Sequence, residues 1–481
     1  MRTRMTLTAL LALVLVSGPG MAQRQNPPSP QILDKVNFPP YQARTLDNGL
    51  RVFALEHPEQ PVLSIQLIIG AGGVNDPADM PGLATFTTDL LDTGTTTRSS
   101  QEIAETIDAA GGSISTRAAR EGIIVTASVL KDSTDLAFEL MTDIVMNPAF
   151  APDEIERLRQ QAGSGMMASL QDPDFLADSS FIRALYGTHP YAHPADGTME
   201  SITEISRDDI VQYHQTYFAP NASALAIAGA VTSEEAFQLA TRWFGDWERR
   251  DVPGVDLSEL PPVAGRRIIV VDDPNSVQTE IRIGQTTVSR KDADYFPILV
   301  ASYVLGGQSG RLMDSLRVER GLTYGAYETI IPRKGPGALY AVTETRTEKT
   351  VEAVQLILGE IDRLRSDQVP EDELEQVKAF LVGSFPLTIE TPGDLGSRLA
   401  NLAVYDLGAE YLATYRDRLS SVSAADVARV AQNIRTDDVL IVLVGKAEEF
   451  LEELAALGSV EVIPLQMLDL NSPTLRNPEQ Q

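Results

Sequence analysis

The chain has 481 residues, of which 43% are hydrophobic and 22% charged, and it carries a formal net charge of -28. This length indicates two domains, and the composition excludes a largely disordered protein. The acidic balance argues against nucleic-acid binding, and the lack of cysteine excludes disulfides, thiolate metal ligands and a cysteine nucleophile.

The first 22 residues have the pattern of a secretory signal peptide. Arg2 and Arg4 precede an apolar run over 7–16, and a small residue, Ala22, closes the segment. The run is shorter than the roughly 20 residues that cross a bilayer, and no later segment qualifies as a membrane span. We therefore expect a secreted protein, located in the bacterial periplasm, whose mature chain begins with a Pro-rich lead over 23–44.

The first half then predicts strands and helices in alternation. A turn at Asp47-Asn48-Gly49 separates two strand-like runs, and the segment 62–69 continues them. Helical spacing of apolar residues follows over 80–94, 99–112 and 133–147, with a strand pair at 113–120 and 122–130.

The same order returns from residue 266. A strand, turn and strand over 266–288 places Pro274 where Pro58 stands in the first half, and 292–310 takes the place of 80–94. Matching segments of the two halves lie about 215 residues apart, which indicates a duplicated α+β domain rather than short solenoid repeats. We predict lobes at 45–250 and 266–465, a Pro-rich linker at 251–265 and a tail at 466–481, with a cleft between the lobes.

This order of elements and the sequence of residues 82–95, GLATFTTDLLDTGT, resemble those of the pitrilysin/insulinase superfamily of inverted zinc peptidases, which includes the mitochondrial processing peptidases. The resemblance covers nearly the whole chain after the signal. It implies two homologous lobes, each a mostly antiparallel sheet flanked by helices, that form half of a clam-shell chamber. In this family H-x-x-E-H on a helix binds zinc and activates water, and the matching positions here are Thr85, Thr88 and Asp89.

The resemblance also implies a glutamate ligand from a later helix. No acidic residue lies between Glu156 and Asp172, and the expected ligand falls near Ser164, Gly165 or Met166. One carboxylate and hydroxyls cannot form a tight zinc site. We therefore expect this chain to have no catalytic residues of its own and to bind no metal.

The four histidines offer little for a metal elsewhere: they are His57, His189, His193 and His214. The pair at 189 and 193 has helical spacing, but Pro190 and Pro194 make a continuous helix improbable, so a turn-rich structural loop is the favoured interpretation. We expect packing or surface roles for the other two.

In the second half, SGRLMDSLRVERGLTYGAYE predicts a helix that Gly321 ends, followed by a strand. By resemblance, the L-R-x-x-x-G-L-x-Y motif here supplies substrate-binding residues, Arg317 and Tyr324. Arg offers donors for peptide carbonyls, and Tyr offers a hydroxyl for an oxyanion. The structural alternative is that Arg317 pairs with Glu319 or Asp314 and that Tyr324 is only a strand residue.

The Gly-rich segment 304–311 precedes this motif. It lacks the G-K-[ST] ending of a phosphate loop, and Arg311 breaks a G-x-S-x-G pattern around Ser309. The resemblance makes Gly306 and Gly307 part of a flexible substrate-binding loop. The alternative is that glycine serves only the turn.

Together these features predict the substrate-binding, non-zinc subunit of a heterodimeric zinc metallopeptidase that degrades peptides and is inactive alone. Its partner is expected to be a homologous, zinc-bearing subunit. The main alternative is a scaffold or peptide-binding protein derived from a peptidase. An active peptidase with a relocated metal site and a serine hydrolase are less well supported.

Overall fold

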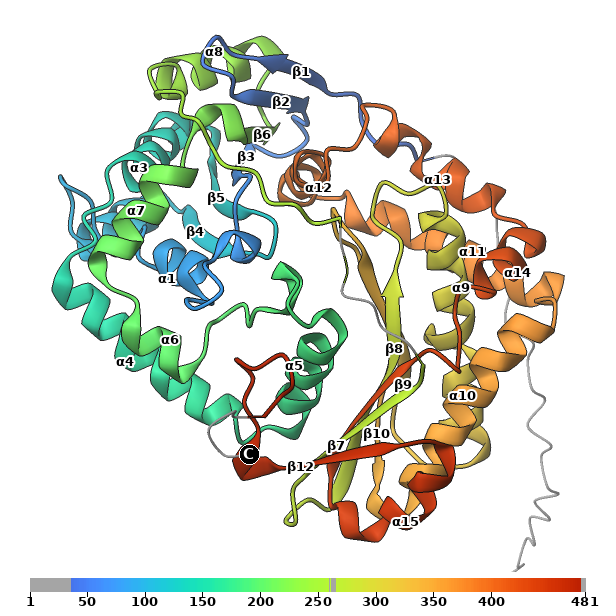
Figure 1. The fold of residues 1–481 in the computed structure, drawn as a ribbon. Coiled ribbons are helices and arrows are strands. Elements are labelled where there is room, and N and C mark those ends of the chain that lie inside the picture. Colours follow the sequence, from blue (N-terminus) through green and yellow to red (C-terminus); the bar gives the residue numbers. More distant parts are fainter. Residues whose placement is uncertain (1–35, 259, 261–264, 477–481) are drawn as a thin grey trace, which may run out of the picture.

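The computed structural model describes residues 36–258, 260 and 265–476, which form two lobes (Figure 1). The predicted signal peptide lies outside the described residues, as do most of the Pro-rich lead and the last five residues of the tail. Among the described residues, no helix combines the length and the apolar character needed to cross a membrane.

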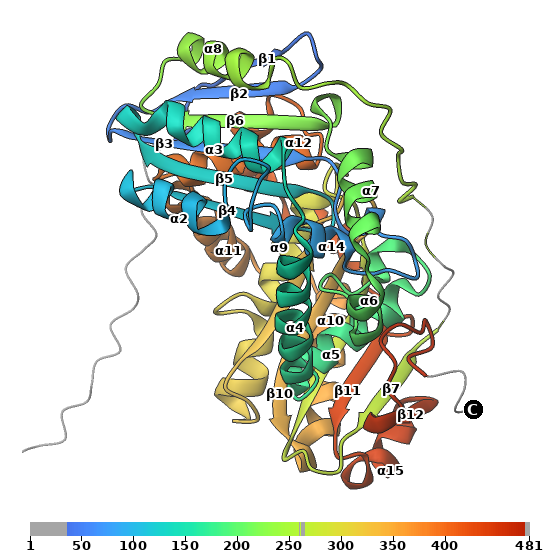
Figure 2. The same cartoon turned by 90° about the vertical axis from the view of Figure 1, so that its left-hand side faces the viewer.

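The first lobe is built on a six-stranded sheet in the order β1-β2-β6-β3-β5-β4, and Figure 2 shows its strands one below another. Only the β2–β6 pair is parallel. Gly49 turns the chain between β1 and β2 with a φ of 90°, a conformation that glycine adopts without strain. The strands are β1 (Gln42–Thr45), β2 (Arg51–Glu56), β3 (Val62–Ile69), β4 (Ser113–Ala118), β5 (Ile123–Leu130) and β6 (Ser223–Gly229).

Helices cover this sheet because their apolar residues recur on one face. Phe138 of α3 and Phe244 at the end of α8 meet with ring centroids 6.4 Å apart. The helices of the first half are α1 (Leu83–Asp89), α2 (Ser100–Ala109), α3 (Thr134–Met146), α4 (Pro152–Ser169), α5 (Pro173–Tyr186), α6 (Met199–Glu204), α7 (Arg207–Tyr217) and α8 (Ser233–Phe244).

The second lobe repeats the plan with a six-stranded sheet in the order β12-β7-β11-β8-β10-β9. Here β7 pairs in parallel with both β11 and β12, and the other pairs are antiparallel. The prediction of two homologous α+β lobes with mostly antiparallel sheets is confirmed. The strands are β7 (Arg267–Asp272), β8 (Gln278–Thr287), β9 (Ala326–Ile331), β10 (Gly337–Arg346), β11 (Leu440–Gly445) and β12 (Val460–Pro464).

Helices α9 and α10 pack on the face of this sheet that lies opposite α5 (Figure 1). A π-helical segment, η5 (Met313–Glu319), replaces the ordinary α-helix predicted before Gly321. The α-helices are α9 (Tyr295–Gly306), α10 (Thr350–Ser366), α11 (Glu371–Ser384), α12 (Pro392–Val404), α13 (Tyr411–Ser421), α14 (Ala424–Ala431) and α15 (Leu451–Leu454).

The two halves exchange one helix each. Helix α5 of the first half packs on β8 and β11 of the second sheet, where the rings of Phe181 and Tyr340 lie 4.6 Å apart. Helix α12 of the second half packs on β3 and β6 of the first sheet, and Gln66 of β3 donates to Gly393 O at 3.0 Å. Each lobe therefore completes the packing of the other, so the lobes are more than tethered neighbours.

A buried arginine fastens α5 to the second sheet. Arg282 of β8 is fully buried and pairs with Asp174 and Asp178 of α5, the latter at 2.6 Å, and with Glu280 at 3.2 Å. A buried guanidinium requires such partners because an uncompensated charge in the protein interior is costly.

Candidate functional site

The first half of the predicted site begins at the N-terminus of α1, which Asp76 holds in place. Its carboxylate accepts hydrogen bonds from the backbone N–H groups of Gly82 and Ala84, both at 2.8 Å. Burial raises the pKa of Asp76 to about 7, although these hydrogen bonds and Arg120 act in the opposite direction. Asp76 therefore anchors the helix that carries the degenerate motif.

On α1, the motif positions are engaged in structural contacts or point to solvent. Thr85 Oγ1 donates to Ala195 O at 2.7 Å, and the buried Thr88 Oγ1 donates to Ala84 O at 2.7 Å. Asp89 keeps exposed surface, but the protein around its carboxylate partly desolvates it, and this desolvation together with the negative charge of Asp196 raises its pKa to about 6. Only one of the three positions offers a free anionic oxygen.

The second half of the predicted metal site is equally poor in ligands. On α4, Ser164 Oγ donates to Gln160 O at 2.8 Å, Gly165 has no side chain, and Met166 is buried. Zinc in proteins takes imidazole, thiolate and carboxylate ligands, so hydroxyls engaged with their own helix and a thioether do not fit it. In the part of the chain that the structure describes, no three His, Asp or Glu side chains gather as a metal ion would require.

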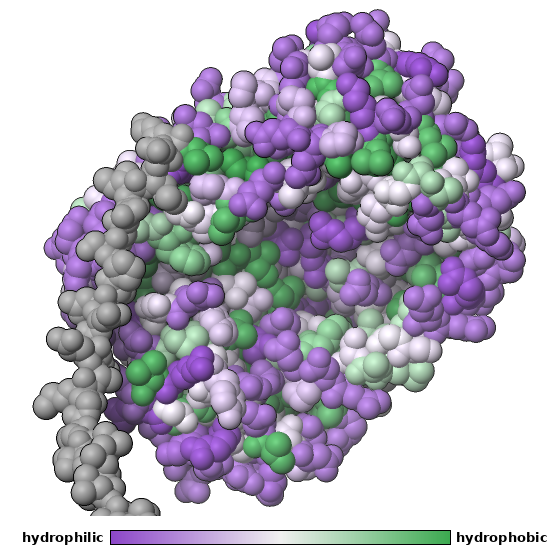
Figure 3. All heavy atoms as spheres, turned by 180° about the vertical axis from the view of Figure 1, so that it is seen from behind, coloured by the Kyte–Doolittle hydropathy of each residue, from purple (hydrophilic) through white to green (hydrophobic). Residues whose placement is uncertain are grey.

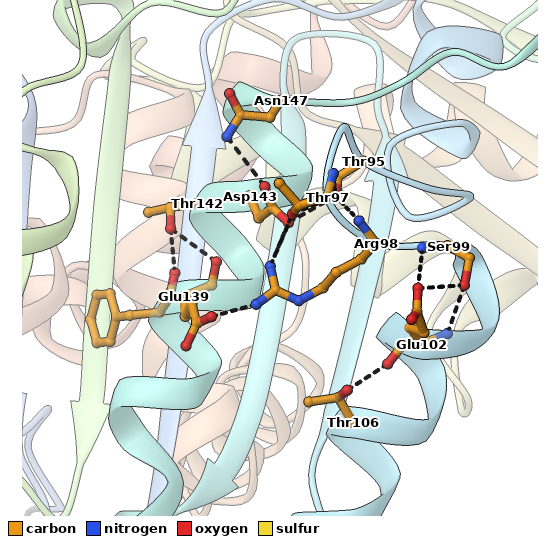
Figure 4. A network of polar contacts seen from close by, with 11 residues as sticks. Thr95, Thr97, Arg98, Ser99, Glu102, Thr106, Glu139, Thr142, Asp143 and Asn147 are labelled. Carbon is orange, nitrogen blue, oxygen red and sulfur yellow. Dashed lines mark hydrogen bonds and ion pairs between the residues drawn. The ribbon is translucent and has the colours of Figure 1, made fainter.

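The loop that follows α1 is nevertheless held firmly. Asp143 of α3 accepts hydrogen bonds from Thr95 Oγ1 at 2.8 Å, Thr97 Oγ1 at 2.9 Å and Arg98 Nη1 at 2.7 Å, as Figure 4 shows. Burial opposes ionisation of Asp143, but these hydrogen bonds outweigh it and lower its pKa. These contacts fix the loop that follows α1 against α3.

His189, His193 and His214 are buried, and the pair at 189 and 193 lies in a turn, as the sequence predicted. His189 and His193 are both buried and flank a short 3₁₀ turn (Pro190–Ala192), not a continuous helix. His189 Nδ1 accepts from Tyr191 N at 3.1 Å, and burial lowers the pKa of His193 to about 4. His214 is also buried, with Nε2 2.8 Å from Val145 O, and its ring packs on Phe218.

Arg317 and Tyr324 lie in the second lobe and point to solvent. Arg317 lies in η5 and is exposed, and Tyr324 is 83% exposed two residues before β9. Within the described ranges, neither side chain makes a hydrogen bond or an ion pair, so Arg317 does not pair with Glu319 or Asp314. Both groups are free to meet a ligand.

The two predicted loop glycines differ in their surroundings. Gly306 is buried at the end of α9, and a Cβ there would lie 1.8 Å from Glu328 N of β9, so glycine is required for this close approach. Gly307 follows it and is partly exposed. Arg311 is fixed by a bidentate pair with Glu373, at 2.7 and 2.8 Å. The packing explains Gly306 by itself, and a substrate role for the two glycines stays a prediction.

The structure thus separates the predicted residues into two groups. Thr85, Thr88 and Asp89 lie in the first lobe, whereas Arg317 and Tyr324 lie in the second, close to the contact of η5 with β9. Figure 3 shows the face behind the view of Figure 1, where hydrophobic and polar residues alternate across the hollowed boundary of the lobes. Sequence reasoning missed Asp76, whose only local signal is its position shortly before the helix.

Two segments match descriptions of one peptidase family. Residues 51–195 match insulinase (peptidase family M16), and residues 204–381 match the peptidase M16 inactive domain. An "Uncharacterized zinc protease" of Mycobacterium leprae is 29% identical over 362 residues, covering 74% of this chain and 80% of its own. The "Probable mitochondrial-processing peptidase subunit beta" of Schizosaccharomyces pombe is 25% identical over 455 residues, covering 86% and 93%.

The fold has a close counterpart among solved structures. A crystal structure of a peptidase M16 inactive domain from Pseudomonas fluorescens superposes with a TM-score of 0.78 and 25% sequence identity. The match covers 84% of this chain and 98% of that chain, so the likeness extends over both lobes.

Proposed function

Because the chain belongs to the insulinase (M16) family of peptidases, we propose that it is the substrate-binding, non-zinc subunit of a two-chain peptidase. The observation that carries this proposal is the contrast between the two lobes. The metal-ligand positions of the first lobe are replaced, whereas Arg317 and Tyr324 of the second are present and unengaged among the described residues. A purely structural protein has no need of either group.

In the proposed complex this chain binds and orients an extended peptide. The Arg317 guanidinium, a rigid fork of donors, binds backbone carbonyl oxygens of the peptide. The Tyr324 hydroxyl donates to the oxygen of the scissile carbonyl, where negative charge develops during hydrolysis. A homologous partner with an intact H-x-x-E-H motif supplies the zinc and the activated water.

Export of the chain is part of the proposal, and it rests on the signal-like pattern of residues 1–22. The acidic surface of the chain, with its net charge of -28, favours solubility of such a complex. The bacterial periplasm is the proposed compartment.

The test is peptide hydrolysis and zinc content of the mature chain, alone and mixed with a homologue that retains H-x-x-E-H. We expect activity only in the mixture, with zinc on the partner. Tyr324→Phe should lower kcat by about 10²–10³-fold, because one donor to the oxyanion is lost. Arg317→Ala should mainly raise KM, because it removes binding to the peptide backbone.

Matched controls come from neighbouring residues. Arg320 is exposed just after η5 and lies 3.9 Å from Glu352, and Tyr327 is 44% exposed on β9. Arg320→Ala and Tyr327→Phe should change kcat and KM less than threefold. If the partner were equally active without this chain, the helper role would be wrong and a scaffold would be the better interpretation.

A further inference from the structure

A cavity with the chemistry of a binding site has neither Arg317 nor Tyr324 among its lining residues. It has a volume of about 260 Å³ and lies among α9, α12, α13 and the segment that follows β9. Its walls are unusually aromatic, with Tyr295, Tyr303, Phe385, Tyr405, Tyr411 and Tyr415 among the lining residues. No aspartate or glutamate lines it, in a chain with 67 acidic and 39 basic residues.

Arg290 supplies the first positive charge of this cavity. Its guanidinium lies 3.9 Å from the ring centroid of Tyr295 and 4.9 Å from that of Tyr411. Its side chain makes no hydrogen bond or ion pair within the described ranges, and Nη1 is buried without a partner. Stacking on aromatic faces positions a guanidinium but leaves its N–H donors unused.

Arg398 of α12 supplies the second positive charge. Its one hydrogen bond to a described residue is a long contact of 3.5 Å from Nε to Thr388 O, and its guanidinium lies 6.0 Å from the ring centroid of Phe385. By contrast, the guanidinium of Arg429 has the carboxylate of Asp294 at 2.7 Å. Two such unpaired guanidinium groups in one cavity leave an uncompensated charge.

A hydroxyl adds to this set of unused donors. Tyr411 is 6% exposed, and its hydroxyl is buried with no hydrogen-bond partner among the described residues. The Tyr405 hydroxyl makes only a long contact of 3.4 Å with Pro332 O. Buried polar groups are nearly always hydrogen-bonded in folded proteins, so these donors indicate a missing acceptor.

We propose that this cavity binds a small organic anion, an aromatic carboxylate, in which Arg290 and Arg398 hold the carboxylate and the tyrosine rings pack on the body. The planar guanidinium fork matches a carboxylate, and aromatic walls favour a flat apolar ligand. The volume is near the lower limit for ligand sites, which suits a single-ring acid. Neither Arg317 nor Tyr324 lines this cavity, so the proposal does not rest on the proposed peptide-binding role.

Calorimetric titration of the mature chain with phenylacetate tests the proposal, with phenylacetamide and inorganic phosphate as parallel probes. We expect saturable binding of phenylacetate, at least tenfold weaker binding of the uncharged amide, and weaker binding of phosphate, which has no aromatic body. Arg398→Gln and Arg290→Gln should each weaken phenylacetate binding about tenfold or more.

Arg418→Gln is the matched control. Its guanidinium also stacks on Tyr411, at 5.4 Å, but Arg418 does not line the cavity. This variant should bind phenylacetate within threefold of the parent chain, and thermal denaturation should show that all three variants are folded. Equal weakening in all three, equal binding of acid and amide, tighter binding of phosphate, or no binding of any probe would each overturn the proposal.

Discussion

Replacement of Arg282 by methionine tests how the exchanged helix α5 is held to the second sheet. The guanidinium is fully buried, whereas Asp174 and Asp178 keep 62% and 47% of their side-chain surface exposed and Glu280 keeps 12%. The two aspartates can turn to water when Arg282 is lost, so they contribute little to the cost. Glu280 cannot, so without Arg282 it must either carry an unpaired charge in a buried position or keep its proton.

The magnitude follows from this difference. Breaking a buried pair by removing one partner costs about 3–5 kcal/mol, and we expect a loss of this size in the free energy of unfolding. Burial already raises the pKa of Glu280 to about 7 despite the attraction of Arg282. Without Arg282, the pKa of Glu280 in the folded state rises further above its value in the unfolded chain. The loss should therefore be smaller at pH 5, where Glu280 is protonated, than at pH 8.

Urea denaturation and hydrogen exchange of the α5 amides measure the effect. The control is Arg429→Met, which breaks an exposed bidentate pair with Asp294 and should cost less than about 1 kcal/mol. The double variant Arg282→Met/Glu280→Met should recover most of the stability, because no charge is left buried. A loss below about 1 kcal/mol for Arg282→Met, or no recovery in the double variant, would refute this reasoning.

Three further predictions concern single residues. Burial raises the pKa of Glu328 to about 8, so the folded state binds this proton more tightly than the unfolded state does. The stability of the fold therefore falls as the pH rises from about 4.5 to 8. Glu328→Gln should flatten this pH dependence in thermal denaturation. Gly306→Ala should destabilise the chain by about 1–3 kcal/mol in urea, because a Cβ there lies 1.8 Å from Glu328 N, whereas Gly359→Ala, with open space around its Cβ, should not destabilise it. Asp143→Asn should cost about 1–3 kcal/mol at pH 7; because the pKa of Asp143 is lowered in the folded state, the difference from the parent should shrink as the pH falls through that pKa.

The sequence by itself determined the local structure and the residue types at the motif positions. Alternating and helical spacings place β4, β5 and α3 close to where the structure has them, and the turn at Gly49 has the positive φ that its residues predict. The residues Thr85, Thr88 and Asp89 at the positions that match H-x-x-E-H are readable without any coordinates, because ligand chemistry depends on residue type.

Only the tertiary structure decided how distant segments meet. No local pattern shows that α5 covers the second sheet and α12 the first, that Arg282 is fully buried beside α5, or that Arg290 and Arg398 share one cavity. Gly306 looks like a loop residue in the sequence, but its need for glycine comes from Glu328 N on β9. Periodicity reports which face of an element is apolar, whereas the partner of that face is chosen by packing of the whole chain.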